Sequence, residues 1–176
     1  MSGPVAIWNE TAALYTERMD AVTDEQWSAQ TPCEEWDVRA LVDHANGVQA
    51  MVAGAFGAQV PEGADWATIR SVIATALEDP SALEGSLPEE SPLGAMPKHQ
   101  VLGIAIGDLL IHTWDLSRAI GADDTLPVGA VQAVQMGLGN MPDEFMRAPG
   151  RFAAAIEVGE AASAQDQLIA FAGRQP

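Results

Sequence analysis

The most apolar stretch of the chain, Val101 to Ile111, lies in a predicted helix over residues 100–120 that carries three ionisable side chains on one face. At 100° per residue, Asp108, His112 and Asp115 project from the same side. Apolar residues share that side: Val101, Ile104, Ala105, Ile111 and Ala119. Burying a charge without a partner is costly, so this helix needs neighbours that satisfy its polar groups.

The residues alone leave two interpretations of this face open. Asp108 and His112 are four positions apart and could both bind one metal ion. A hydrogen-bonded Asp–His pair that ties helices together would satisfy the same groups. Asp115 could orient a metal-binding imidazole from behind, or it could form an ion pair with Arg118 or Arg39.

Apolar residues recur at helical spacing in further long segments, so the sequence predicts an all-α fold. We expect the second helix to begin after Asp37 rather than at Thr31, because the apolar period starts only at Val38. Asp65 or the residues just after it begin a third helix. Together with the helix over 100–120, the main predicted helices span residues 5–19, 38–52 and 65–77. They indicate a four-helix bundle, in which sites are built from side chains on facing helices.

The connections and the C-terminal part complete the predicted organisation. A Pro- and Gly-containing connection over 81–98 is long enough to border a site. Beyond it we expect an apolar helix over 127–139, an irregular stretch over 141–150, a short strand or extended segment over 151–160, and a last helix capped by Ser163. The length favours one domain, residues 1–176, with 151–176 as a C-terminal extension of the bundle.

Composition limits the function classes. The net charge of −17 argues against binding nucleic acid or an anionic membrane surface. Cys33 is the single cysteine, which rules out an internal disulfide and fits a reducing cytoplasm. The first residues lack the basic start of a signal peptide, and the most apolar stretch is too short to span a bilayer. We therefore expect a cytoplasmic protein.

His44 lies on the predicted second helix, on the flank of its apolar stripe. If that helix faces residues 100–120, then His44, Asp108 and His112 offer two imidazoles and one carboxylate to one point. Such a set leaves coordination positions open, as in catalytic zinc and non-haem iron sites, and zinc, nickel, iron or manganese all accept these ligands. A thiolate-caged structural zinc is excluded because only Cys33 could contribute sulfur.

Two motifs carry a family resemblance. They are Thr-Pro-Cys-x-x-Trp-Asp-Val-Arg-x-Leu-Val-x-His, residues 31–44, and Asp-x-x-x-His-Thr-Trp-Asp-Leu-x-Arg-Ala, residues 108–119. Together they resemble the metal-binding domain of mycothiol-dependent maleylpyruvate isomerase, of the DinB/YfiT-like superfamily of four-helix bundles. The ending, from Arg151 to Arg174, is similar to an actinobacterial branch. The resemblance implies that His44, Asp108 and His112 bind a divalent metal, with Asp108 where the isomerase has Glu.

The resemblance also implies a chemistry. It suggests a metal-dependent transferase or isomerase that uses a low-molecular-weight thiol such as mycothiol and an electrophilic substrate. The isomerase itself has a further C-terminal domain that this sequence is too short to include, so maleylpyruvate isomerisation is not expected. The alternatives are a non-catalytic module in which the ion stabilises the bundle and a hydrolase using metal-activated water. Pairing through helix faces would give a homodimer.

Four other side chains in or near these motifs have simpler interpretations. We expect Trp36 and Trp114 to belong to the core rather than to a pocket, and Cys33 to be inert. His99, at the edge of the long connection, is expected to be solvated, with a proton donor at the mouth of a site as the alternative.

Overall fold

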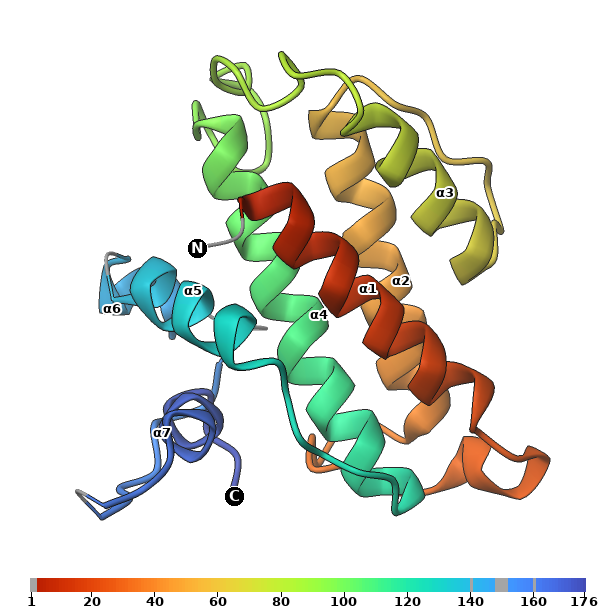
Figure 1. Cartoon of the computed structure of the whole chain (residues 1–176), viewed down its shortest axis with the longest axis vertical. Coiled ribbons are helices and arrows are strands. Elements are labelled where there is room, and N and C mark those ends of the chain that lie inside the picture. Colours follow the sequence, from red (N-terminus) through yellow and green to blue (C-terminus); the bar gives the residue numbers. More distant parts are fainter. Residues whose placement is uncertain (1–2, 140, 148–151, 160) are drawn as a thin grey trace.

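The computed structural model describes residues 3–139, 141–147, 152–159 and 161–176. Four helices, α1 (Pro4–Asp20), α2 (Val38–Ala55), α3 (Trp66–Ala76) and α4 (Lys98–Ile120), form the bundle. Helices α1 and α2 both pack against α4, and α3 packs against α2 (Figure 1). The predicted all-α, four-helix bundle is therefore confirmed. The described residues contain no strand, although they include two isolated bridges, Gln30 to Asp37 and Ser86 to Pro97.

Side-chain capping explains where α2 and α3 begin. The Asp37 carboxylate accepts a hydrogen bond from the Ala40 amide at 2.9 Å, and Asp65 accepts one from the Thr68 amide at 2.9 Å. Each bond satisfies an amide that has no partner within its own helix. Helix α4 follows Pro97 and ends at Gly121, whose φ of 72° is the left-handed conformation common after helices. The predicted starts at Asp37 and Asp65 are thus confirmed.

Helix α4 is the centre of the molecule. Every residue from Leu109 to Ser117 is buried, which requires neighbours on all sides of the helix. Helices α1 and α2 supply the largest contacts, and α5 (Val128–Leu138) covers a third side. The buried Gln49 of α2 joins three helices, because it accepts from Trp8 Nε1 at 3.1 Å and donates to the Ala105 carbonyl at 2.9 Å.

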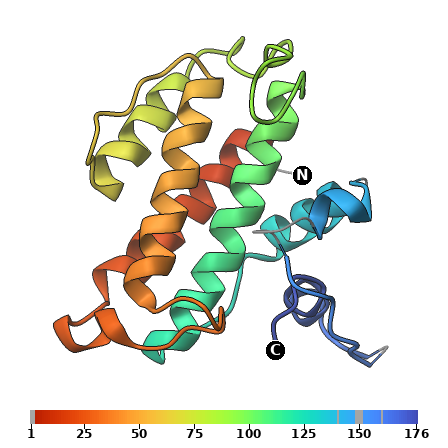
Figure 2. The ribbon, with the colours of Figure 1, turned by 180° about the vertical axis from the view of Figure 1, so that it is seen from behind.

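The C-terminal part packs beside α4 and α5 (Figure 2). Here α7 (Ala164–Phe171) begins at Ser163, whose hydroxyl accepts from the Asp166 amide at 3.0 Å, as predicted. Residues 152–159 form neither a helix nor a strand, so the strand alternative for this segment is wrong and the extended alternative remains. Its predicted ends, Arg151 and Glu160, lie outside the described residues. The expectation of an irregular stretch over 141–150 was wrong in part, because α6 (Asp143–Met146) is helical.

Gly173 turns the chain immediately after α7. Its φ is 82°, and a Cβ at this position would lie 2.7 Å from the Cβ of Ala153. Only glycine fits both the left-handed backbone and the close approach of the extended segment. The turn directs Arg174 back toward α4, where its side chain is 9% exposed.

Candidate metal centre

The candidate site lies where α2 and α4 face each other, with His44 on α2 and Asp108 and His112 on α4. His44 Nε2 is 3.3 Å from Asp108 Oδ1, and His112 Nε2 is 3.6 Å from the same oxygen. The ligand atoms of the three residues all lie within 4.8 Å of one another. The structure thus brings together the residues that the sequence singled out. Their role as metal ligands is a proposal.

Asp108 is incompletely satisfied. Both imidazoles approach Oδ1, whereas Oδ2 is buried and has no hydrogen-bond partner in the structure. Buried polar atoms normally have a partner, so an orphaned carboxylate oxygen between two histidines calls for an explanation. A divalent cation would supply one, since carboxylate and imidazole are its usual ligands.

The other ring nitrogen of His112, Nδ1, interacts with Asp115. Asp115 Oδ2 lies 3.0 Å from His112 Nδ1, and the carboxylate is fully buried. Burial works to lower the pKa of His112, but the charge of Asp108 and the hydrogen bond to Asp115 outweigh it and raise that pKa to about 10. Burial likewise opposes ionisation of Asp115, yet its bonds to His112 and Arg174 hold the pKa of the carboxyl below its usual range.

Arg174 is the ion-pair partner of Asp115. Its Nε donates to Oδ1 at 3.2 Å and its Nη2 to Oδ2 at 3.0 Å. The sequence-based alternatives, Arg118 and Arg39, were wrong: Arg118 pairs with Asp124, and the Arg39 guanidinium lies over the ring of Trp27. Orientation of His112 by Asp115 agrees with the geometry.

The loop before α2 completes the surroundings. Thr31 fixes this loop, since its hydroxyl donates to the Trp36 carbonyl at 2.8 Å and accepts from the Cys33 amide at 3.1 Å. The Trp36 ring lies against both imidazoles, with centroid distances of 4.4 Å to His44 and 5.6 Å to His112. Trp36 therefore borders the site, and it is also partly buried against the core, so both interpretations of this residue hold in part.

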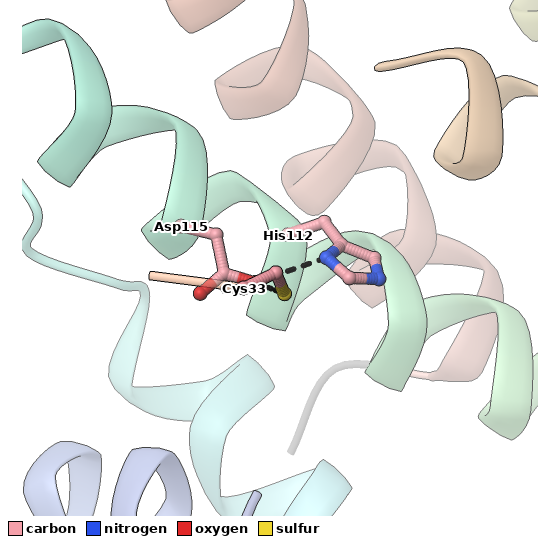
Figure 3. Close-up of side chains that lie close together, drawn as sticks. All are labelled: Cys33, His112 and Asp115. Atoms are coloured by element: carbon pink, nitrogen blue, oxygen red, sulfur yellow. Dashed lines mark hydrogen bonds and ion pairs between the residues drawn. The ribbon is translucent and has the colours of Figure 1, made fainter. Parts of the chain in front are cut away.

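We call the side of His112 that contains Asp115, Cys33 and Arg174 its Nδ1 side. Figure 3 shows the sulfur beside the carboxylate, and Cys33 Sγ is 3.4 Å from Asp115 Oδ2. Nη2 of Arg174 donates to the sulfur at 2.8 Å. Sequence reasoning missed this assembly, because Cys33 and Arg174 are 141 residues apart.

The remaining residues singled out from the sequence lie away from this assembly. Trp114 is 2% exposed and belongs to the core, as predicted. His99 is exposed in the first turn of α4, ~13 Å from Asp108 at 1.5 Å of helix per residue. That separation favours the solvated interpretation of His99.

Comparison with known proteins assigns the chain to a family. Residues 7–70 match the model of the mycothiol maleylpyruvate isomerase N-terminal domain. Uncharacterized proteins from two strains of Mycobacterium tuberculosis are 32% identical over 160 residues, covering 87% of this chain and 87% of their own length. The chain belongs to the mycothiol maleylpyruvate isomerase N-terminal domain family. No solved structure matches it.

The matched residues of this family cover α1, α2 and the first part of α3, with Cys33, Trp36 and His44. Asp108 and His112 lie outside the match, so their place in the site depends on the geometry described above. No helix in the described part of this family member is long and apolar enough to cross a membrane.

Proposed function

We propose that the protein is a metal-dependent transferase or isomerase that uses a low-molecular-weight thiol. The observation that carries this proposal is an open set of ligands. His44, Asp108 and His112 converge on one point, while the side chains of His44 and Asp108 are 32% and 16% exposed. Three protein ligands with one side open to solvent are typical of catalytic rather than structural metal sites.

The residues present fit a divalent ion. The orphaned Oδ2 of Asp108 and the two Nε2 atoms beside Oδ1 are the atoms a cation would satisfy. Zinc is the first candidate, with nickel, iron and manganese compatible with the same donors. When bound, the ion supplies a Lewis acid that favours the deprotonated form of a thiol or a water at neutral pH.

The protein's own residues prepare this chemistry. Metal binding requires His112 to be neutral; in the tautomer with the proton on Nδ1, Asp115 would accept that proton, and the Nε2 lone pair would be directed toward Asp108 and the metal position. The Trp36 ring covers one face of His44 and restricts its orientation. The side chain of His44 is 32% exposed, so this side of the proposed site is accessible from solvent.

The family supports the choice of a thiol as co-substrate. The family model is named for mycothiol maleylpyruvate isomerase, and the match includes the loop and helix that carry Trp36 and His44. We propose mycothiol or a related thiol as the nucleophile. Its deprotonated sulfur would bond to one carbon of an activated double bond, whose π bond would break, and the neighbouring carbon would take up the proton that the thiol released.

Metal content tests the ligand set. We expect about one divalent ion per chain in gently purified protein, and its loss in His44→Ala and Asp108→Ala. The chain contains three histidines, so His99→Ala is a matched control that should retain the ion. Equal metal content in all four proteins would refute the site.

A structural ion is the second candidate, because His44 and Asp108 come from different helices that an ion would join. Calorimetric titration of the metal-loaded protein with mycothiol separates the two. The thiol-using enzyme binds mycothiol only when metal is present. If the ion is structural, it raises the melting temperature by mass action, and the titration shows no mycothiol binding.

A further inference from the structure

The Nδ1 side of His112 contains a second set of donors suited to a metal. Sγ of Cys33, a nitrogen of His112 and a carboxylate oxygen of Asp115 lie within 4.8 Å of one another. Figure 3 shows the three side chains meeting beside α4. Sulfur, imidazole and carboxylate together are ligands for zinc and similar ions. His112 belongs to both sets, so one imidazole lies between two potential cation positions.

Arg174 already places a cation in this second set. One nitrogen, Nη2, donates to Cys33 Sγ at 2.8 Å and to Asp115 Oδ2 at 3.0 Å. Nε donates to Asp115 Oδ1 at 3.2 Å, and Nη1 donates to the Ala172 carbonyl at 2.7 Å. Every nitrogen of the guanidinium is therefore used. A metal on the same donors would have to displace a buried positive charge from its partners.

We propose that Arg174 is a positioning residue that excludes metal from the Cys33–His112–Asp115 set and thereby directs the ion to His44, Asp108 and His112. The exclusion follows from occupancy, since the guanidinium occupies two of the three donors that a second ion would need, Cys33 Sγ and the Asp115 carboxylate. The positioning acts through Asp115, whose carboxylate is fixed by Arg174 and in turn fixes His112 Nδ1. The positioning part rests on the proposed function, whereas the exclusion part does not.

The geometry explains why arginine suits this role. The planar guanidinium binds both oxygens of Asp115 and still reaches the sulfur, which a single ammonium cannot match. Lysine would preserve the charge but not the two-point contact. Arg174→Lys should therefore exclude a second ion while holding His112 less firmly.

Cobalt(II) titration of the full chain tests the proposal, because sulfur coordination gives a charge-transfer absorption in the near ultraviolet. We expect the natural protein to bind Co²⁺ without this absorption. Arg174→Ala should acquire it, and Arg174→Ala combined with Cys33→Ser should lose it again. Arg118→Ala, which removes a guanidinium paired with Asp124 at the surface, is the matched control and should behave as the natural protein.

Zinc affinity measures the positioning part. Loss of an outer partner typically weakens metal binding by roughly 10–100-fold, and we expect Arg174→Ala to fall in that range, with Arg174→Lys between it and the natural protein. Sulfur absorption in the natural protein would overturn the proposal. So would metal binding by Arg174→Ala with neither sulfur absorption nor weaker zinc affinity.

Two further outcomes separate this inference from the proposed function. If the natural protein binds no Co²⁺ but Arg174→Ala shows sulfur absorption, the proposed function fails and the exclusion stands. If the natural protein binds one ion and Arg174→Ala is unchanged, the inference alone fails. Should Arg174→Ala lose its helical circular dichroism, Arg174→Gln, which is neutral and closer in volume, is measured in its place with the same expected results.

Discussion

On the Nδ1 side of His112, Asp115 and Arg174 are paired through both carboxylate oxygens and are almost completely buried. On the Nε2 side, which contains His44 and Asp108, both side chains are partly exposed and one carboxylate oxygen has no partner. One imidazole therefore joins a completed network to an incomplete one. This contrast between the two nitrogens, with the unpartnered oxygen of Asp108, is the structural basis of the proposed metal site.

The largest expected effect on stability comes from disrupting the paired Asp115 and Arg174 on the Nδ1 side of His112. Asp115→Ala leaves the Arg174 guanidinium buried without its carboxylate, and we expect a loss of about 3–5 kcal/mol in the free energy of unfolding of the metal-free protein. Urea denaturation followed by circular dichroism measures this loss. Asp124→Ala removes the carboxylate of an exposed pair and should cost less than about 1 kcal/mol. Similar losses for the two variants would contradict the comparison.

An intermediate effect is expected from pH in protein stripped of metal. The pKa of His112 is raised from 6.5 to about 10 in the folded state, so the folded protein binds a proton that the unfolded chain releases at lower pH. This contribution to stability is fully present below pH ~6.5 and is lost as the pH rises toward 10. The urea midpoint should decline over that interval, and the decline should be smaller in His112→Gln. A decline of equal size in both proteins would show that other groups cause it.

The smallest expected effect concerns Trp36, whose ring borders the Nε2 side of His112. Trp36→Leu removes the ring that lies against His44, and we expect about 0.5–1.5 kcal/mol of lost stability together with weaker zinc binding. Trp27→Leu is the matched control, because Trp27 is half-buried in the same N-terminal part of the chain and its ring contacts Arg39. Loss of stability in both variants, with weaker zinc binding only in Trp36→Leu, would place Trp36 at the site.

The sequence predicted the Nε2 side of His112 better than the Nδ1 side. Local rules placed Asp108 and His112 one helical turn apart, and capping at Asp37 set the phase of the helix that carries His44. That this helix faces Asp108 and His112 was a condition of the prediction, and the family resemblance supported it. Arg174 is 59 residues from Asp115 and approaches through a turn, for which helical periodicity gives no signal. A buried Asp115 required some cation, but only the packing of α7 and its following turn could identify which one.

Gly173 has a consequence for anyone who wishes to transplant this site. Copying His44, Asp108, His112 and Asp115 onto another helical bundle would reproduce the proposed ligands and Asp115 but not the guanidinium that pairs with Asp115. The guanidinium arrives because a residue without a side chain tolerates a φ of 82° and lets Ala153 approach. A faithful graft must therefore include the extended segment, α7 and the glycine turn, so the smallest portable unit of the site is far larger than its list of polar residues.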